Sequence, residues 1–290
     1  MRVVYSPQYE IALPGHVWPT TKYRRIADSL RARADVLFVE PSLASWDALA
    51  LVHTAEYLAK LRDNTLTAED IATLELPWSQ GLVDAFRLMV GGTIAAGRAA
   101  LEDGVAAHIG GGLHHAFANH GEGFCPLNDV AIAVRVLGRR AAIVDLDVHH
   151  GNGTAMIFER DPSVFTFSMH QQHNYPLFKP RGSLDVGLED GASDERYLSL
   201  LGDALPRVMA HEPAIVFYLA GADPFELDRL GGLKLTRAGL AERDRLVIAG
   251  VREAGLPLAT VLAGGYAADV NDTVAIHTAT IEAMAAAAAA

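Results

Sequence analysis

The chain has 290 residues, of which 50% are hydrophobic, so it is long enough to bury a sizeable core. Its formal net charge of −11 argues against a general nucleic-acid-binding protein, which would show a basic patch. The same charge is compatible with a basic substrate, such as a lysine-bearing protein or a polyamine, although it equally serves solubility.

Cys125 is the only cysteine, which excludes a disulfide framework and a thiolate metal site and favours a small buried hydrophobe. Residues 1–10 lack the apolar core of a signal peptide, and charges or glycines interrupt the longest apolar runs. We therefore expect a cytoplasmic protein that neither spans a membrane nor binds nucleic acid. No linker divides the chain, so we predict a single domain over residues 1–290, with a terminal alanine run that extends the last helix or frays.

Short apolar runs alternate with segments of helical length. The runs that predict buried parallel strands are 35–40, 105–110, 141–148, 163–169, 214–221 and 258–265. The clearest helical stretches are 79–103, 193–212 and 236–255. This alternation predicts an α/β fold with a central, mostly parallel sheet, and the segment 170–191 is expected to be an ordered functional loop.

Polar residues follow five of these predicted strands. In chain order they are His114 and His115, then Asp145, Asp147, His149 and His150, then Ser168 and His170, then Asp223, and finally Tyr266. In open α/β sheets, ligands bind in the crevice outside the carboxyl ends of the strands. One such residue alone is usually a cap or a satisfied core group, but five strand ends together predict one site.

Asp147 and His149 lie two positions apart, so their side chains point to the same side of an extended segment. With Asp223 from another strand end they supply three ligands and leave an open position, which is the pattern of a catalytic zinc. Asp145 is then free to orient a histidine from outside the ligand set. The alternative is a buried ion-pair network, which the absence of Lys and Arg near these strand ends disfavours.

His114 and His115 follow three consecutive glycines, Gly110 to Gly112. Adjacent side chains normally point apart, but glycine permits backbone conformations in which both imidazoles face one cavity.

Five motifs resemble the zinc-dependent histone deacetylase family, which includes bacterial acetylpolyamine and acetoin-utilisation relatives. They are GGGLHHA (110–116), GFCPLNDVAIA (123–133), DLDVHHGNGT (145–154), AGAD (220–223) and AGGY (263–266). The stretches HTAEYL (53–58), DRLGGL (228–233) and RDRLV (243–247) are most similar to the class IV branch. The resemblance implies a single-domain, arginase-like three-layer α/β fold.

The resemblance also implies roles for individual residues. Asp147, His149 and Asp223 would bind zinc, His115 would be the general base, His114 its electrostatic partner on Asp145, and Tyr266 the donor to the substrate carbonyl. Asn152 would orient His115, where the best-known class I members have Asp. Asp145 and Ser168 would line a potassium or sodium site, and Gly112, Phe124 and Tyr175 would line an acyl-lysine channel.

We therefore expect a zinc-dependent deacylase that acts on acetyl- or acyl-lysine in a protein or peptide, with acetylated polyamines or other small amides as alternative substrates. A ureohydrolase with two manganese ions would need further ligands, for which only Asp145 and Asp228 are spare. An acyl-lysine-binding module without activity is disfavoured because base, ligands and tyrosine are all present. The sequence leaves the acyl length and the oligomeric state open.

Overall fold

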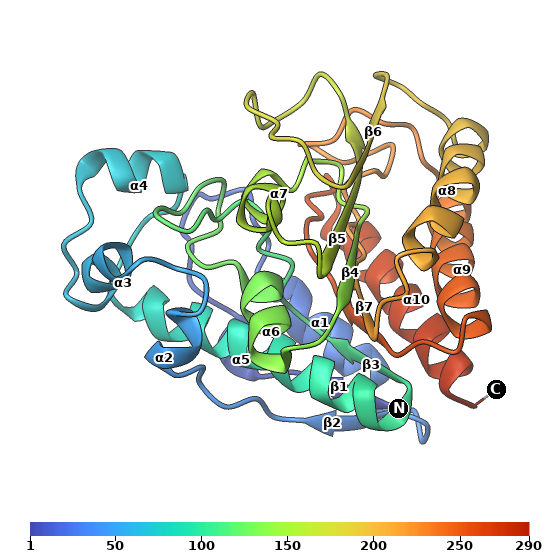
Figure 1. Ribbon diagram of the computed structural model, residues 1–290, viewed down its shortest axis with the longest axis horizontal. Helices are drawn as coiled ribbons and strands as arrows, with labels where there is room; N and C mark the ends of the chain where they lie inside the picture. The colour runs from blue at the N-terminus through green and yellow to red at the C-terminus, as the bar shows by residue number, and fades with distance from the viewer. Residues whose placement is uncertain (290) are drawn as a thin grey trace.

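All eight strands of the central sheet are parallel, in the order β2-β1-β3-β8-β7-β4-β5-β6 (Figure 1). The structure is a computed structural model that describes residues 1–289. The strands are β1 (Arg2–Val4), β2 (Leu37–Val39), β3 (Val105–His108), β4 (Ala141–Asp145), β5 (Val164–Gln171), β6 (Leu184–Leu188), β7 (Ile215–Leu219) and β8 (Leu258–Val261).

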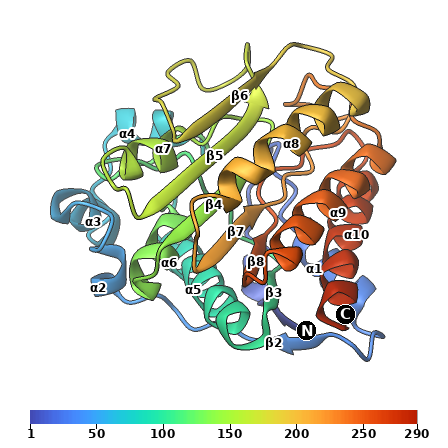
Figure 2. The ribbon, with the colours of Figure 1, turned by 45° about the vertical axis from the view of Figure 1, so that its right-hand side comes forward.

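Helices cover both faces of this sheet, which gives three layers (Figure 2). The helices are α1 (Thr21–Leu30), α2 (Trp46–Leu49), α3 (Ala55–Arg62), α4 (Ala68–Leu74), α5 (Gly81–Asp103), α6 (Asp129–Leu137), α7 (Asn152–Phe158), α8 (Asp194–Met209), α9 (Arg237–Glu253) and α10 (Val270–Ala289), with a 3₁₀ turn at Pro7–Tyr9. One face is covered by α5 and α6, and the other by α8, α9 and α10.

The central strands are largely apolar because successive side chains enter different cores. Along β7, Ile215 and Phe217 pack in the core that contains α5 and α6, whereas Val216 and Tyr218 pack in the core beneath α8 and α9. All of these side chains are fully buried. The sequence therefore shows a continuous apolar run here instead of alternation.

Local signals set the helix ends. Asn128 caps α6 by accepting a hydrogen bond from the Ala131 N–H, and Thr236 caps α9 by accepting one from Gly239. Gly138 ends α6 with a backbone φ of 59°, in the left-handed region that favours glycine.

The predicted α/β class and parallel sheet are confirmed, with corrections at the edges. The segment 170–191, expected to be a loop, contains the end of β5 and all of β6. Only the terminal residues of β6 are buried, as is usual for an edge strand, so its sequence lacks an apolar run. The run at 35–40 forms a strand, but at the opposite edge, where Leu37 is 63% exposed instead of buried. The short strand β1 was not predicted.

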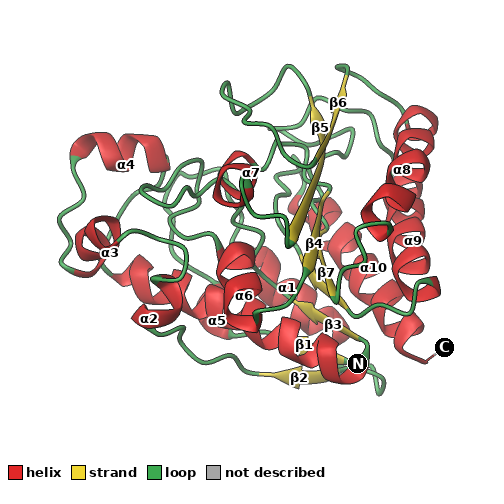
Figure 3. Ribbon diagram, in the orientation of Figure 1, coloured by secondary structure: helices red, strands yellow, loops and turns green. Residues whose placement is uncertain are grey.

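The longest loops lie at the carboxyl ends of the strands, at the top of Figure 3. The polar residues that the sequence analysis predicted to form one site lie at these carboxyl ends of the strands. Within residues 1–289, no helix combines the length and the apolar character needed to cross a membrane.

Candidate active site

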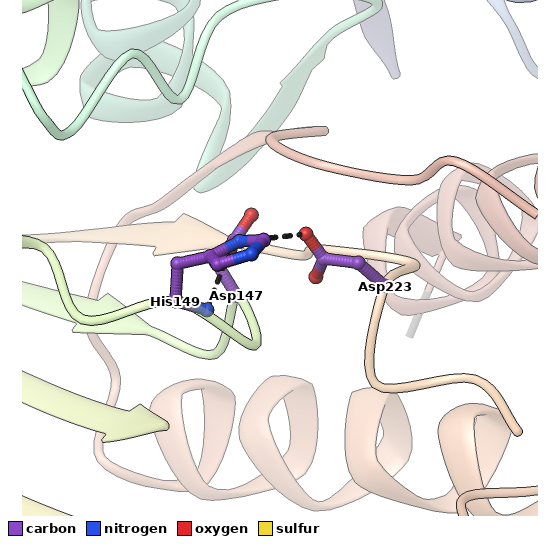
Figure 4. Close-up of side chains that lie close together, drawn as sticks. All are labelled: Asp147, His149 and Asp223. Atoms are coloured by element: carbon purple, nitrogen blue, oxygen red, sulfur yellow. Dashed lines mark hydrogen bonds and ion pairs between the residues drawn. The ribbon is translucent and has the colours of Figure 1, made fainter. Parts of the chain in front are cut away.

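Two loops at the centre of the sheet bring together Asp147, His149 and Asp223 (Figure 4). The first two residues follow β4 and the third follows its neighbour β7. One ligand atom from each lies within 4.8 Å of the others, and all three side chains are buried. His149 Nδ1 lies 3.0 Å from Asp147 Oδ1 and 3.4 Å from Asp223 Oδ2. We call these three residues the acid–histidine cluster.

Backbone N–H groups hold the two carboxylates of the cluster in place. Asp147 accepts hydrogen bonds from the N–H groups of His149 and Gly264, at 2.9 and 2.8 Å, and Asp223 Oδ1 accepts one from Val148 at 2.9 Å. A Cβ at Gly264 would stand 1.9 Å from Asp223 Oδ2, so only glycine fits at this point. The loop after β8 therefore closes directly over both carboxylates.

One buried oxygen of the cluster has no hydrogen bond. Asp223 Oδ2 receives no donor from any of the residues 1–289. Burial, together with the nearby negative charge of Asp147, raises the pKa of Asp223. Burial alone would lower the pKa of His149, but its contacts with both carboxylates outweigh this and raise it to about 10. Two carboxylates, one imidazole and an unpaired buried oxygen are a donor set that fits a divalent cation such as zinc.

The glycine turn after β3 places two imidazoles beside this cluster. Gly111 and Gly112 have φ values of 72° and 83°, which only glycine adopts readily. The Nε2 atoms of His114 and His115 are then 3.1 Å apart, as the sequence predicted for a glycine-rich turn. The Nδ1 atom of His114 donates to Asp145 Oδ2 at 2.7 Å.

The two histidines have opposite electrostatic environments. Burial would lower the pKa of His114, but the charges of Asp145 and Asp147 raise it to about 9. Burial and the positive charges of His114 and His149 lower the pKa of His115 well below its usual range. His115 Nδ1 instead contacts the neutral amide of Asn152, whose Oδ1 lies 2.8 Å away. One imidazole therefore favours the charged form and the other the neutral form that a base requires.

A cavity of about 180 Å³ opens onto these groups. Its wall includes Gly112, Phe124, Tyr175 and Tyr266, which the sequence analysis singled out. The Phe124 ring meets Tyr266 edge-on at 6.0 Å, and the Tyr175 ring meets His115 at 5.0 Å. Burial and the charges of the cluster carboxylates raise the pKa of Tyr266 well above its usual range, so its hydroxyl stays protonated and can donate.

Three further lining residues were not found from sequence. Trp18 and Tyr23 line the cavity although they precede the first motif by about ninety residues, and Trp18 Nε1 donates to the Tyr23 hydroxyl at 3.2 Å. Glu75, after α4, lines it as well. Nothing in the local sequence of these residues signals a site, because long-range packing alone brings them there.

The expectation that no Lys or Arg lies near the strand ends is wrong. Lys22 on α1 is fully buried, and its Nζ donates to Ala263 O at 3.2 Å. Arg243 on α9 is also fully buried and donates to Gly221 O at 2.5 Å and to Leu146 O at 3.4 Å. Both cations come from helices distant in sequence, so inspection of the strand ends alone missed them.

These buried cations do not complete the acid–histidine cluster. Burial lowers the pKa of Lys22 to about 8, against the opposing influence of the carboxylates Asp223, Asp147 and Asp228. Arg243 Nη2 forms an ion pair with Asp244, at 2.8 Å, and not with either cluster carboxylate. The nearest cationic group to the unpaired oxygen of Asp223 is thus the imidazole of His149.

Asp145 and Ser168 lie opposite each other in the β4–β5 register. Ser168 Oγ lies 3.1 Å from His170 Nδ1. The potassium or sodium site expected at this pair stays a prediction. Asp228, the other spare acid, accepts backbone N–H groups from Leu230, Gly231 and Tyr266.

The comparisons with known proteins agree with this architecture. The model of the histone deacetylase domain matches residues 16–281. The chain is 43% identical over 285 residues to an uncharacterized protein of Picosynechococcus sp., covering 95% of both chains. It is 32% identical to histone deacetylase 2 of Arabidopsis thaliana, covering 91% of this chain and 74% of that protein. It is 30% identical to the acetoin utilization protein AcuC of Bacillus subtilis, covering 80% and 68%.

Among solved structures, the crystal structure of the HDA15 HD domain aligns with a TM-score of 0.80 and 25% identity, covering 98% of this chain and 90% of that one. The parallel sheet, the helical layers on its two faces and the site at the carboxyl ends of its strands define an α/β protein of the arginase and deacetylase type. The chain belongs to the histone deacetylase family. This membership supports an enzyme, a deacetylase in the general sense, whereas assignment to class IV stays a prediction.

Proposed function

We propose that the protein is a zinc-dependent deacylase that hydrolyses the side-chain amide of acetyl- or acyl-lysine. The observation that carries the proposal is the meeting of three elements at one cavity: the acid–histidine cluster, the neutral imidazole of His115 and the protonated hydroxyl of Tyr266. Amide hydrolysis needs these elements together, because it requires an activated water, a polarised carbonyl and a proton for the leaving amine.

Asp147, His149 and Asp223 would hold the zinc ion. When bound, the ion would supply Lewis-acid chemistry, lowering the pKa of water and polarising a carbonyl. One oxygen of the cluster, Asp223 Oδ2, is buried without a hydrogen bond, and a divalent cation bound there would satisfy it.

His115 would take the proton from the attacking water and later deliver it to the leaving nitrogen. Its lowered pKa keeps the imidazole neutral near pH 7. The charged His114, fixed by Asp145, would stabilise negative charge beside it. Tyr266 would donate a hydrogen bond to the oxygen that becomes negative as the tetrahedral intermediate forms.

The cavity wall would select the substrate. Phe124 and Tyr175 would present aromatic surface to the apolar stem of an acylated lysine. Gly112 also lines the cavity, and its lack of a side chain allows a close approach to Ala263, from which a Cβ would lie only 2.6 Å. The net charge of −11 favours a basic protein or peptide as substrate. An acetylated polyamine shares this charge and stays the second candidate, and the acyl length is open.

A ureohydrolase with two manganese ions and an acyl-lysine-binding module without activity both have less support. A second metal ion would need further ligands, and Asp145 and Asp228 are already engaged with His114 and with three backbone N–H groups. A binding module without activity would have no use for a buried neutral imidazole beside a cation site. A cytoplasmic location stays a prediction from sequence.

A panel of substrates tests the proposal. Purified, zinc-loaded protein is assayed against acetyl-lysine and long-chain acyl-lysine peptides and against acetylpolyamines, with and without a chelator. We expect chelator-sensitive turnover of at least one acyl-lysine peptide. Turnover of polyamines alone would shift the substrate class, and absence of turnover with zinc bound would refute the proposal.

The variant His115→Ala separates catalysis from metal binding. General-base catalysis is typically worth about 10²–10⁴-fold, and we expect kcat to fall by that order while one zinc stays bound per chain. His211→Ala is the matched control, because that histidine lies at the amino ends of the strands, away from the site, beside Arg140 and Ser163. Near-normal turnover in His115→Ala would contradict the role of the base.

A further inference from the structure

Glu122 is a carboxylate that the sequence motifs did not single out. It lies just before the segment that carries Phe124, and its side chain is 19% exposed. Its Oε1 accepts hydrogen bonds from Asn152 Nδ2 at 2.9 Å and from the Tyr175 hydroxyl at 2.8 Å. Glu122 does not line the cavity, so it reaches the site only through these two partners.

The contact with Asn152 completes a chain of hydrogen bonds. His115 Nδ1 lies 2.8 Å from Asn152 Oδ1, and Asn152 Nδ2 points to Glu122. Asn152 is fully buried, so water cannot replace either partner. An aspartate at position 152 would place a carboxylate in direct contact with His115. Here the carboxylate is that of Glu122, and the amide of Asn152 lies between it and the imidazole.

An asparagine is ambiguous, because its oxygen and its NH₂ group have almost the same shape. Either end could face His115, and each favours a different tautomer of that imidazole. If the oxygen faces it, Nδ1 must carry the proton and Nε2 is free to accept one. If the NH₂ group faces it, Nδ1 must accept, and the proton sits on Nε2, where the base is needed. The charged His114 directs its Nε2–H at His115 Nε2, 3.1 Å away, and so also favours the tautomer with the proton on Nδ1.

Glu122 removes this ambiguity because an ionised carboxylate only accepts hydrogen bonds. The reversed amide would bring two acceptor oxygens together at about the hydrogen-bonding distance, at an unfavourable energy. Burial would raise the pKa of Glu122, but hydrogen bonds from His120, Tyr175 and Asn152 outweigh it and lower the pKa, so the group is ionised near pH 7.

We propose that Glu122 is a positioning residue: it fixes the Asn152 amide and, together with the Nε2–H group of the charged His114, holds His115 in the Nδ1–H tautomer. This inference rests on the proposed function only in that His115 serves there as the base. The same Glu122 oxygen also receives the Tyr175 hydroxyl, so one carboxylate orients both the base and part of the cavity wall.

Three substitutions at this position form a series in hydrogen-bond polarity. Glu122→Gln keeps an acceptor oxygen for Asn152 but adds an NH₂ group, Glu122→Met removes both kinds of partner, and Glu122→Lys offers only donors and so favours the reversed amide. We expect kcat to fall by less than about 3-fold, by about 10-fold and by about 100-fold in that order, the range found when partners of active-site groups are removed.

A second substitution supplies the rescue. Asn152→Asp presents an acceptor to His115 in either orientation, so the base no longer depends on position 122. We expect the double variant Glu122→Lys/Asn152→Asp to recover kcat to within about 3-fold of the wild-type protein, a coupling that a double-mutant cycle measures. If Glu122 only supported local packing, Asn152→Asp would not restore what Glu122→Lys removed.

Two controls bracket the series. Glu159→Lys makes the same change of charge just after α7, the helix that carries Asn152, at a side chain that is 53% exposed, and kcat should not change. Tyr175→Phe removes the second donor to Glu122 Oε1 and should act mainly on KM, because Tyr175 lines the cavity.

The tautomer itself can be measured without activity. In metal-free protein labelled with ¹⁵N-histidine, the His115 signals are assigned by their loss in His115→Ala. We expect the proton on Nδ1 in the wild-type protein and a larger share of the Nε2–H tautomer in Glu122→Lys, where the reversed amide opposes the preference set by His114. An unchanged tautomer, equal losses across the series or absent rescue would overturn the inference. A wild-type protein that hydrolyses no substrate would refute the proposed function, while the NMR spectra would still decide the role of Glu122.

Discussion

Two buried polar clusters lie at the carboxyl ends of the strands, and they differ in completeness. The acid–histidine cluster leaves Asp223 Oδ2 without a donor. In the second, which we call the arginine cluster, Asp244 Oδ1 accepts from Arg243 and Tyr218, and Oδ2 accepts from Thr280. Burial is nearly complete in both clusters. Burial of charge therefore does not distinguish the two clusters. They differ in that Asp223 Oδ2 is the only buried carboxylate oxygen within residues 1–289 that has no hydrogen-bond partner.

The clusters also differ in what they connect. Arg243 donates to the carbonyl groups of Leu146 and Gly221, which lie next to Asp147 and close to Asp223 in sequence. The arginine cluster thus fixes the loops that follow β4 and β7. These loops carry Asp147, His149 and Asp223, so the arginine cluster supports the positions of the acid–histidine cluster. Predictions that remove one member from each cluster test this division of roles.

The largest expected effect follows from Asp223→Ala. Loss of one of three candidate ligands should abolish zinc binding and reduce turnover to the level of the chelator-treated protein. Metal analysis after dialysis and the acyl-lysine assay measure both quantities. An unchanged zinc content would contradict the place of Asp223 in the ligand set.

Next in size is the effect of Arg243→Leu on stability. Removing one partner of a buried ion pair leaves Asp244 uncompensated, and the free energy of unfolding should fall by about 3–5 kcal/mol. Urea unfolding followed by circular dichroism measures this change. Arg245→Leu is the control on the same helix, because Arg245 pairs with Glu242 at the surface and its loss should leave the midpoint unchanged.

Tyr266→Phe addresses the cavity rather than either cluster. Removal of one oxyanion donor typically costs about 2.7–4 kcal/mol, so kcat should fall by about 10²–10³-fold. Zinc content and the unfolding midpoint should stay at wild-type values, because the Tyr266 hydroxyl makes no hydrogen bond within residues 1–289. Turnover close to wild-type would remove Tyr266 from the mechanism.

The smallest expected effect is the sharpest test of the comparison. Asp223→Asn keeps the oxygen that Val148 contacts and removes a buried negative charge that Asp147 repels. In metal-free protein, the free energy of unfolding should stay the same or rise by about 1 kcal/mol. A loss comparable to that of Arg243→Leu would show that Asp223 is structural, like the arginine cluster.

Sequence reasoning was most accurate at the centre of the sheet. β4, β7 and β8 are buried on both faces, so their apolar runs stand out in the sequence. It was least accurate towards the edges of the sheet: the edge strand β6 was taken for part of a loop, and β1, which lies next to the other edge strand β2, was missed. An edge strand such as β6, with Asp185 exposed, has no apolar run to reveal it.

By itself the sequence determined the fold class, the location of the site at the carboxyl ends of the strands, and the set of candidate ligands. It could do so because the members of each pair are neighbours in the sequence: Asp147 and His149 share one loop, and His114 and His115 follow one glycine turn. Only the tertiary structure showed that Lys22 and Arg243 approach the site and that Asn152 donates a hydrogen bond to Glu122. The physical reason is that pairing of buried charges depends on distance in space, which residues far apart in the chain do not reveal by their order.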